Sequence, residues 1–332
     1  MSPADPDRPV PPAAALEGAP NLAGEPCVQL SVVVCTYRRV DKLEACLASL
    51  AAQSLPKDQF EVIIVNNAPD EAARVQQVVS NVFATTGLAW RVVQADRPGL
   101  FHARNAGLGA VQGEIVSFID DDATASPDWL WQLARAFREH PQAGVIGGHI
   151  VLVPPEPRPY VLRGGRERYW SHFVTQYPDY VEVTNYWEFP WGANWSARRD
   201  ALRRVGGFPT DFKGFANFER RGLAVIGDDL IAAGRIMQLG YRIAILPQAI
   251  VYHHVDASRY TLRHIWQRIL AATFFRSLAR RHLEAAPSRL GIAYERAKIP
   301  ALLRRQGPVF LVVWEIACHL AARLLVLVCR LR

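Results

Sequence analysis

The sequence predicts an α/β fold in which helices flank a mostly parallel central sheet, followed by C-terminal amphipathic helices. Short runs of apolar, β-branched residues alternate with segments whose apolar residues recur at helical spacing. The runs are continuously apolar, as expected for strands that helices cover on both faces. Strands and helices that alternate at this interval predict βαβ units with right-handed crossovers.

Five apolar runs mark the strands of the first half. The expected strands are 30–35, 60–65, 90–94, 115–119 and 145–153. Asp41 is a candidate N-cap of the helix after the first strand, because Glu44 stands three residues on, as in a capping box. Pro69 suits the first position of the second helix, which we expect to run through Val79.

The connections after the third and fourth strands are also predicted to be helical. Small residues fill 103–111, and Ser126 and Pro127 suit the start of a helix that runs to His140. Beyond Pro154 the pattern changes. The expected elements there are an irregular aromatic stretch at 160–195, a short helix at 198–205, a glycine-containing loop at 211–227, a helix at 228–239, short strands at 241–246 and 250–253, and basic helices at 260–305.

The chain divides into three parts. Its first 29 residues are rich in Pro and Ala and poor in large apolar residues, which predicts a disordered arm. Asp5 and Asp7 stand where a signal peptide would carry positive charge, so no signal peptide is expected. The parts are the arm 1–29, a central domain 30–255 with halves 30–125 and 126–255, and a basic helical extension 256–332 with an apolar tail helix 308–329.

Composition narrows the class of protein. Half of the 332 residues are apolar and 21% are charged, which suffices for a large core. The formal net charge of +7 indicates a polyanionic partner: nucleic acid, phosphate-bearing ligands or an anionic membrane face. Five cysteines without a CxxC or zinc spacing exclude a disulfide scaffold and predict a reducing, cytoplasmic location. The composition also excludes a collagen-like chain and a polytopic membrane protein.

The tail helix is the most apolar segment of the chain. Its polar residues Glu315, His319 and Arg323 are spaced by four and share one helix face. A single span would put that face in lipid. We therefore expect a helix that lies in or against the inner face of the cell membrane, helped by flanking arginines, with one membrane-spanning segment or a core helix as alternatives.

Three consecutive carboxylates, Asp120, Asp121 and Asp122, follow the fourth strand. Ligands bind at the carboxyl ends of strands in open parallel sheets. The three charges repel one another, and a divalent cation on substrate phosphates explains such a cluster. The alternative interpretation is a solvated acidic turn that precedes the next helix.

Two further polar signals lie late in the chain. Asp228 and Asp229 open a helix after Gly227, and Asp229 is either a general base or only a helix cap. Adjacent Asp228 raises the pKa expected for Asp229, while the helix terminus lowers it. His253 ends the last short strand and is either a metal ligand or a core histidine.

Polar and aromatic residues near the other strands are weaker signals. Thr36, Tyr37 and Arg39 follow the first strand, where they would contact a nucleotide or form an ordinary loop. Three tryptophans at 187, 191 and 195 offer apolar faces to a sugar ring, although packing alone also explains them.

These motifs, in this order, resemble the family 2 glycosyltransferases, inverting enzymes with the GT-A fold. The matching segments are Thr36-Tyr37-Arg38-Arg39, Pro98-Gly99-Leu100, Ala103-Arg104-Asn105 with Gly107, Phe118 through Asp122 with Pro127-Asp128-Trp129-Leu130, Trp191 through Asn194, Gly206-Gly207-Phe208, Asp228-Asp229 with Arg235 and Gly240-Tyr241, and Pro247 through His253. The resemblance implies a GT-A catalytic domain at 30–255, in which the half 30–125 binds the nucleotide-sugar and the half 126–255 binds the acceptor.

The resemblance also implies roles for the matching residues. Asp120, Asp122 and His253 would hold Mg²⁺ or Mn²⁺ on the donor diphosphate, and Asp229 would be the catalytic base. The donor site would comprise Thr36, Tyr37, Arg39, Asn66, Arg104, Asp120 and Asp121. The acceptor site would comprise Trp191, Gly192, Asn194 and Asp228.

The sequence departs from the family pattern at three places. Asn66 and Asn67 stand where the family has an Asp that contacts the nucleotide base, and Asp228 replaces a Glu. The segment 266–268 does not reproduce the Gln-x-x-Arg-Trp motif of processive members, so we expect single additions.

The expected reaction is the transfer of one hexosyl-type sugar from a nucleoside-diphosphate sugar, first of all a UDP-sugar, with inversion. The expected acceptor is a hydroxyl of a glycan or lipid-linked glycan, in cell-envelope or extracellular polysaccharide synthesis. One alternative is an inactive nucleotide- or sugar-binding module of the same fold, which Asn66 favours. A sugar nucleotidyltransferase or a dehydrogenase would need a glycine-rich loop after the first strand, and 36–40 contains no glycine. The basic residues lie beside apolar helices, so anionic lipid rather than nucleic acid is the expected partner.

Overall fold

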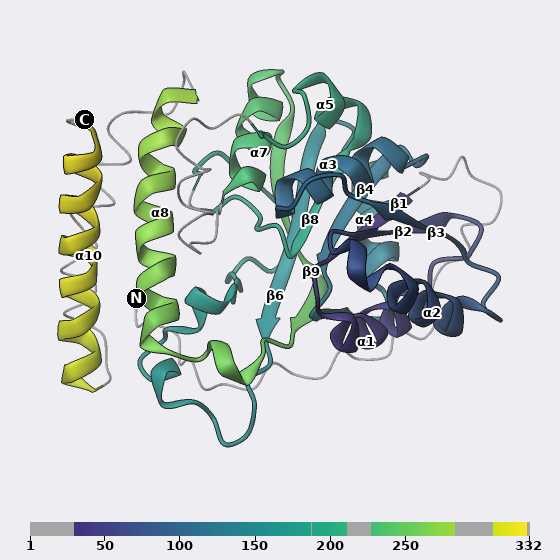
Figure 1. Cartoon of the computed structure of the whole chain (residues 1–332). Helices are drawn as coiled ribbons and strands as arrows, with labels where there is room; N and C mark the ends of the chain where they lie inside the picture. Colours follow the sequence, from purple (N-terminus) through teal and green to yellow (C-terminus); the bar gives the residue numbers. More distant parts are fainter. Residues whose placement is uncertain (1–29, 187, 211–226, 283–307, 331–332) are drawn as a thin grey trace.

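The computed structural model describes residues 30–186, 188–210, 227–282 and 308–330. Its centre is a nine-stranded sheet with helices on both faces (Figure 1). The strand order is β3-β2-β1-β4-β8-β6-β9-β5, and β7 pairs with β9. The expected disordered arm, Trp187, the loop at 211–226 and the expected helices at 283–307 lie outside the described residues.

Four parallel strands form the first half of the sheet, and all four were predicted. They are β1 (Leu30–Thr36), β2 (Phe60–Asn66), β3 (Ala89–Gln94) and β4 (Ile115–Asp120). The helices between them are α1 (Val40–Ala51), α2 (Ala72–Phe83) after the 3₁₀ turn η1 (Pro69–Glu71), and α3 (Leu100–Ala110). β1, β2 and β4 are buried on both faces, as predicted, whereas the edge strand β3 is only half-buried.

The second half of the sheet adds five strands, of which three were not predicted. They are β5 (Ala123–Ala125), β6 (Ala143–Leu152), β7 (Val181–Val183), β8 (Asn194–Arg198) and β9 (Arg242–His253). β8 lies antiparallel between β4 and β6, so the sheet is mixed, and parallel pairing is confined to the first four strands and the pair β6–β9. β9 is one strand rather than two, because a bulge opposite Gly148 and His149 takes up Pro247 without ending the strand.

Two cores lie on opposite faces of the sheet. The remaining elements are α4 (Trp129–Glu139), α5 (Arg199–Arg204), α7 (Asp228–Gln238), α8 (Leu262–His282), α10 (Val309–Arg330) and the 3₁₀ turns η2 (Tyr160–Leu162), η3 (Glu167–Trp170) and η4 (Ala257–Arg259). Val32 and Val34 of β1 belong to the core under α1, α2 and α4. Val33 points the other way, into the core under α3, α5 and α7. At Gly107 of α3 a Cβ would come within 2.5 Å of Val33 Cγ1, so a glycine lets this helix lie against β1.

Two of the predicted helix N-caps are wrong. Arg39, not Asp41, precedes α1, and its side chain makes no capping bond, so the predicted capping box is wrong. The positive φ of 55° at Arg38 turns the chain before Asp41 is reached, and the Arg39 guanidinium is bonded to a carboxylate instead. Likewise Asp128, not Ser126, precedes α4.

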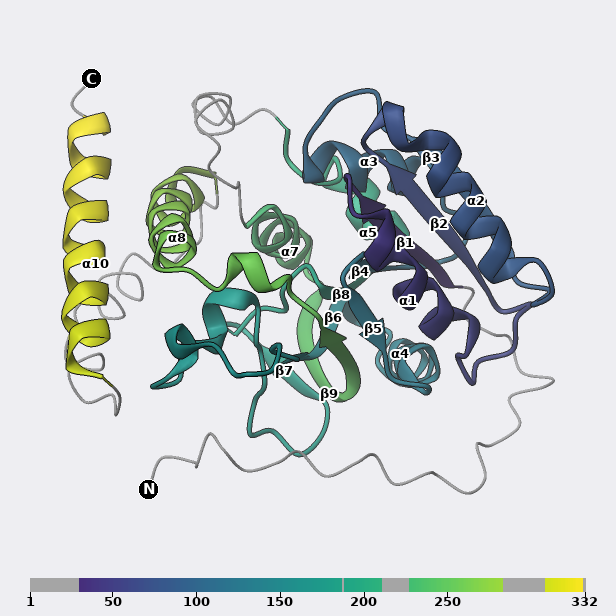
Figure 2. The same cartoon turned by 60° about the horizontal axis from the view of Figure 1, so that its bottom comes forward.

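The C-terminal extension packs on the α/β domain through a third core. α8 and α10 lie side by side at one end of the molecule, and α8 is the nearer to the sheet (Figures 1 and 2). Glu315 of α10 is buried and forms an ion pair with Arg166, whose Nε lies 3.0 Å from Glu315 Oε2. The polar side of α10 therefore faces the protein. Among the described residues, the structure contains no helix with the length and apolar content that a bilayer crossing requires.

The Arg166–Glu315 pair predicts a large stability effect. Replacing Glu315 by Ala leaves a guanidinium that is only 1% exposed without its counter-ion. We expect the free energy of unfolding to fall by about 3–5 kcal/mol, measured by urea denaturation.

Glu139→Ala is the control, because Glu139 is 49% exposed in its pair with Arg135. This control should change the stability by less than about 0.5 kcal/mol. Equal effects of the two substitutions would show that Glu315 does not anchor α10.

Candidate functional site

The acidic cluster lies between two strands of the sheet. Asp120 is the last residue of β4, and Asp121 and Asp122 connect it to β5. β5 runs antiparallel to the end of β9, where Ala123 is opposite His253, and the amide of His254 donates to Asp122 O at 2.7 Å. Strand pairing thus brings the carboxylates and His253 together, although 131 positions in the sequence separate Asp122 from His253.

Asp120, Asp122 and His253 form a group with metal-ligand geometry. One donor atom from each lies within 4.8 Å of the others. His253 Nε2 is 3.0 Å from Asp122 Oδ1 and 3.9 Å from Asp120 Oδ2, and His253 Nδ1 is 3.0 Å from the carbonyl oxygen of Trp170. A carbonyl only accepts, so Nδ1 carries a hydrogen and Nε2 is directed at the two carboxylates. With a cation present, Nε2 offers its lone pair, and the donor set suits a divalent metal.

Arginines partly neutralise this cluster. Arg39 bonds Asp122 and lies 3.4 Å from Asp121 Oδ1, and Arg259 of η4 lies 3.7 Å from Asp122 Oδ2. Although burial favours the protonated form of Asp122, the hydrogen bond and charge of His253, with the arginines, hold its pKa well below the usual range. Asp122 is therefore an anion at neutral pH.

Asp121 differs from its neighbours. Burial raises the pKa of Asp121 to about 7, against the effect of Arg39. Neither of its oxygens has a hydrogen-bond donor in standard geometry among the described residues, and neither does the buried hydroxyl of Thr36 nearby on β1. Buried polar atoms without partners are rare in folded proteins, and these two side chains suit a polar ligand.

A second pair of carboxylates stands at the start of α7. Gly227, at φ 94°, precedes Asp228 and Asp229, and a Cβ there would meet Phe275 of α8 at 2.6 Å. Asp228 Oδ2 accepts from Arg104 Nη1 at 2.7 Å, and both side chains are nearly buried. The pair fixes the start of α7 against α3.

Asp229 is buried and has the properties of a base. Its Oδ2 accepts from the amide of Gly192 at 2.6 Å, and its Oδ1 accepts from the amide of Leu230 at 2.8 Å. Burial, and then the charge of Asp228, raise the pKa of Asp229 to about 6, while Arg104 and the two amides oppose the rise. The expected direction of the Asp228 effect is confirmed.

Two arginines connect the carboxylate clusters. Against the effect of burial, the charges of Asp228, Asp229 and Asp120 raise the pKa of Arg104. Burial, and then Arg259, lower the pKa of Arg268 on α8 to about 10, and the charges of Asp229 and Asp120 oppose this. Both arginines are therefore near enough to carboxylates of both clusters to interact with their charges, so the two clusters are neighbours.

Sequence analysis missed Arg259 and Arg268 as site residues. Both belong to the basic extension, which was attributed to lipid. The local sequence contains one signal for Arg259: it follows His253 by six residues in a turn that the Asp256 side chain caps through Ser258 N. No local signal marks Arg268, because only the packing of α8 against the rest of the protein brings it near the carboxylates.

The predicted nucleotide-binding residues lie at the carboxyl end of β1 and β2. Tyr37 is 52% exposed, and the Arg38 guanidinium lies 5.7 Å from its ring centroid. Asn66 is fully buried, and its amide serves the protein itself. Asn66 Nδ2 donates to Ala68 O and Gln94 Oε1, while its Oδ1 accepts from Ala68 N. The structure uses Asn66 to shape the turn after β2, and both hydrogens of its amide are bonded within the protein.

Some residues of the aromatic segment lie beside the candidate site, and others lie in the core. Gly192 lies against the site, since a Cβ there would meet Arg104 Nη2 at 2.1 Å. Trp191 is half-buried against Phe173. Trp195 is fully buried between Phe118 and Phe208, so the interpretation of Trp195 as a sugar-stacking residue is wrong.

Asn194 also serves the fold. Its Oδ1 accepts from Trp129 Nε1 at 2.9 Å, and its Nδ2 donates to the carbonyls of His149 and Ala249. This amide joins β8 to β6, β9 and α4, and it has no remaining hydrogen for an acceptor sugar.

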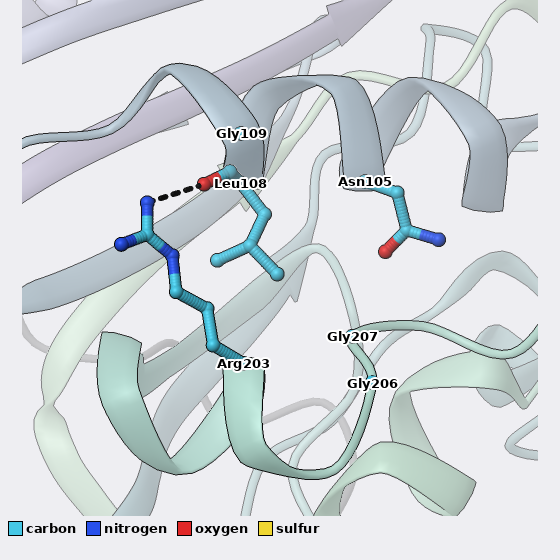
Figure 3. Close-up of a pocket in the computed structure, with 6 residues that line it drawn as sticks. All are labelled: Asn105, Leu108, Gly109, Arg203, Gly206 and Gly207. Atoms are coloured by element: carbon cyan, nitrogen blue, oxygen red, sulfur yellow. Dashed lines mark hydrogen bonds between the residues drawn. The ribbon is translucent and has the colours of Figure 1, made fainter.

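A small pocket lies away from these carboxylates, between α3 and α5. Figure 3 shows its lining residues Asn105, Leu108, Gly109, Arg203, Gly206 and Gly207. Arg203 Nη2 donates to Leu108 O at 3.2 Å, and the Asn105 amide pairs with the backbone of Phe208. Its polar groups are thus paired within the protein.

Curated relatives resemble part of the chain. A glucosyl-dolichyl phosphate glucuronosyltransferase of Haloferax volcanii is 31% identical over 193 residues, which are 55% of this chain and 57% of the relative. The succinoglycan biosynthesis protein ExoM of Rhizobium meliloti is 32% identical over 121 residues, 36% of this chain and 38% of the relative. The chain thus matches less than two thirds of the length of either relative.

Solved structures share the fold. The mannosyltransferase PcManGT of Pyrobaculum calidifontis, in complex with GDP-Man and Mn²⁺, has a TM-score of 0.53 at 22% identity and covers 89% of this chain and 74% of its own. The S. aureus protein TarS (residues 1–349), in complex with UDP, has a TM-score of 0.50 at 22% identity over 73% of this chain and 65% of its own.

The family model described as "Glycosyl transferase family 2" matches residues 31–206, more than half of the 332-residue chain. The match contains β1 to β8, the acidic cluster and Gly192. Together with the mixed sheet and its structural neighbours, it shows that this chain belongs to glycosyl transferase family 2 and has the GT-A fold.

Proposed function

We propose that the protein is a glycosyltransferase that moves one sugar from a nucleoside-diphosphate sugar to a hydroxyl acceptor with inversion. The observation that carries the proposal is the meeting of two carboxylate groups in one site. Asp120, Asp122 and His253 are arranged to hold a cation, and the buried Asp229 has a pKa of about 6. The curated relatives named as a glucuronosyltransferase and as a succinoglycan biosynthesis protein support this reaction class.

The acidic cluster is the proposed donor site. A divalent cation, Mn²⁺ or Mg²⁺, would stabilise the negative charge that develops on the departing diphosphate. The imidazole in the donor set favours Mn²⁺ over Mg²⁺, and a structural neighbour was solved with Mn²⁺. UDP and GDP-Man in the neighbours support a nucleotide-sugar donor, and we propose a UDP-sugar first.

Arginines extend this site on the phosphate side. Arg39 forms an ion pair with Asp121, and Arg259 forms one with Asp122. Arg268 interacts with the charges of Asp229 and Asp120. The three arginines are not each paired with a carboxylate of their own. We assign them to the diphosphate oxygens, whose charge increases as the glycosidic bond to the donor breaks. Thr36 and Tyr37 at the end of β1 would contact the nucleoside, and Asp121 its polar groups.

Asp229 is the proposed general base. A pKa of about 6 leaves its carboxylate ionised at neutral pH, yet more basic than an ordinary aspartate. The Gly192 amide fixes Oδ2, while Asp228 is neutralised by Arg104 and stays out of the proton transfer. The acceptor oxygen loses its proton to Asp229 while it attacks the anomeric carbon opposite the diphosphate, which inverts that carbon.

A glycan or lipid-linked glycan is the proposed acceptor. Trp191, Gly192 and Asp228 lie beside the base, and the half-buried Trp191 ring offers an apolar surface to a sugar. The name of the Haloferax volcanii relative contains a dolichyl phosphate, which supports a lipid-linked acceptor. Asn194 is left out of this set because its amide is hydrogen-bonded within the fold.

Replacing Asp229 by Asn should separate catalysis from donor binding. The rate of transfer should fall by about 10²–10⁴-fold, because an amide cannot take the proton. Donor affinity measured by calorimetry should stay within a few-fold of the wild type. The control is Asp200→Asn at a site that is 78% exposed. An equal loss of rate and donor affinity in Asp229→Asn would exclude Asp229 as the base.

The rate of nucleoside-diphosphate release should depend on pH through Asp229. Below pH 6 the carboxyl holds its proton, so kcat/KM should rise about tenfold per pH unit up to about 6 and level off above 7. Asp228→Asn removes the charge that raises this pKa, so the acidic limb should move to lower pH. A limb that stays in place or moves upward would contradict the assigned interaction.

Nucleotide binding should require the metal ligands. The panel comprises UDP, GDP, dTDP and CMP, each with Mn²⁺ and with a chelator. We expect one nucleoside diphosphate to raise the melting temperature of the protein in Mn²⁺, and chelation to abolish this rise. Asp122→Ala should lose this stabilisation, whereas Asp58→Asn on an exposed turn should keep it. If no nucleotide stabilises the wild type, the chain is better explained as an inactive module of the same fold.

A further inference from the structure

The side of α10 that faces away from the protein is apolar along its described length. Its exposed large side chains are Val309, Phe310, Val313, Leu320, Leu324 and Leu325, with exposed fractions of 46–76%. Ala317 and Ala321 are the other exposed residues between 309 and 325, so no exposed residue in this described stretch is charged. We call these eight residues the outward face. Their spacing of three or four residues forms one continuous stripe.

The polar residues of α10 are turned inward. Glu315 pairs with Arg166 and also accepts from the Tyr169 hydroxyl, and His319 is 2% exposed beside them. A helix at a water-facing surface has the opposite arrangement, with polar residues outside and apolar residues in the core. Because the ion pair fixes the rotation of α10, the helix cannot bury its outward face without breaking that pair.

The outward face is accessible as a whole. Figures 1 and 2 both place α10 at the edge of the molecule, with α8 between it and the sheet. Leu311, Cys318 and Ala322 are buried on the opposite side of the helix. Within the part of the chain that the structure describes, one side of α10 is therefore held by protein, while the exposed side chains of the other are available to a flat apolar surface.

The charge of the C-terminal extension distinguishes between two possible partners of the outward face, a second copy of the chain and a lipid surface. Residues 256–332 contain 14 Lys and Arg against 4 Asp and Glu, a net charge of +10, whereas residues 1–255 contain 24 against 27. Two copies of the chain that met through their outward faces would bring two segments of +10 together, and these would repel. An anionic lipid surface attracts the same segment.

We propose that the outward face of α10 docks on the surface of an anionic phospholipid bilayer, with the helix parallel to the membrane plane. Phe310, Val313, Leu320 and Leu324 enter the boundary between headgroups and acyl chains, and basic residues of the extension other than Arg259 and Arg268 attract the headgroup phosphates. The inward ion pair remains in the protein throughout. This docking is independent of sugar transfer, so the proposal and the proposed function can fail separately.

Vesicle flotation of the full chain tests the proposal. The probes are vesicles of phosphatidylcholine alone and of phosphatidylcholine with phosphatidylglycerol, each at low and high salt. We expect binding to anionic vesicles that weakens with salt, because headgroup attraction is screened. The double substitution Phe310→Glu and Leu324→Glu should reduce this binding by more than about tenfold, since two anions replace apolar side chains at the lipid boundary.

The control places the same chemical change elsewhere on the surface. Leu239→Glu alters an apolar residue that is 40% exposed after α7 and should leave vesicle binding unchanged. Circular dichroism and a cooperative thermal unfolding transition establish that each variant is folded. The proposal is overturned if the wild type does not float with anionic vesicles or if the double variant floats equally well. The outward face would instead belong to a contact between two copies if the wild type does not bind vesicles but forms a dimer by light scattering, and the double variant does not form this dimer.

Discussion

The pairing of β5 with the end of β9 is the contact on which the candidate site depends. It places His253 opposite Ala123, one residue beyond the three consecutive carboxylates. Without this pairing, Asp120 and Asp122 would lack the imidazole that completes their donor set, and Asp122 would lose its principal counter-charge. Because β9 also pairs with β6 along most of its length, the position of His253 is fixed by the centre of the sheet.

Similar carboxylates acquire different properties from their surroundings. Asp122 is held ionised by His253 and arginines, whereas burial raises the pKa of Asp121 to about 7 and that of Asp229 to about 6. Asp228 has a buried guanidinium as its partner at 2.7 Å. The separation of these environments is what would allow the proposed cation site and the proposed base to lie close together, since both proposed functions rest on aspartate.

The C-terminal extension contacts the candidate site on one side and has an exposed apolar surface on the other. Its inner side contributes Arg259 and Arg268 to the candidate site, and Phe275 packs against Gly227 at the start of α7. Its outer side is the apolar face of α10, which the Arg166–Glu315 pair holds in position. The proposed donor site and the proposed lipid surface are thus connected through one helix, α8, so a shift of α8 would affect both.

The sequence by itself determined the features that are encoded within short windows. Continuous apolar runs predicted β1 to β4, and the carboxylates predicted at a strand end and at the start of α7 are found there. The spacing of apolar residues identifies these elements because helices cover the strands and each helix buries one face. The order of the motifs also predicted the family that the comparisons show.

Tertiary structure alone decided which polar groups find each other. The insertion of β8 between β4 and β6, the use of the Asn66 and Asn194 amides within the fold, and the approach of Arg268 all depend on contacts between residues far apart in the chain. The rotation of α10 is the same kind of outcome: its residues define two faces, and only a buried Arg166 determines which one turns inward. A hydrogen bond or ion pair formed across long loops leaves no periodic pattern in the sequence, so its partners become known only when the chain is folded.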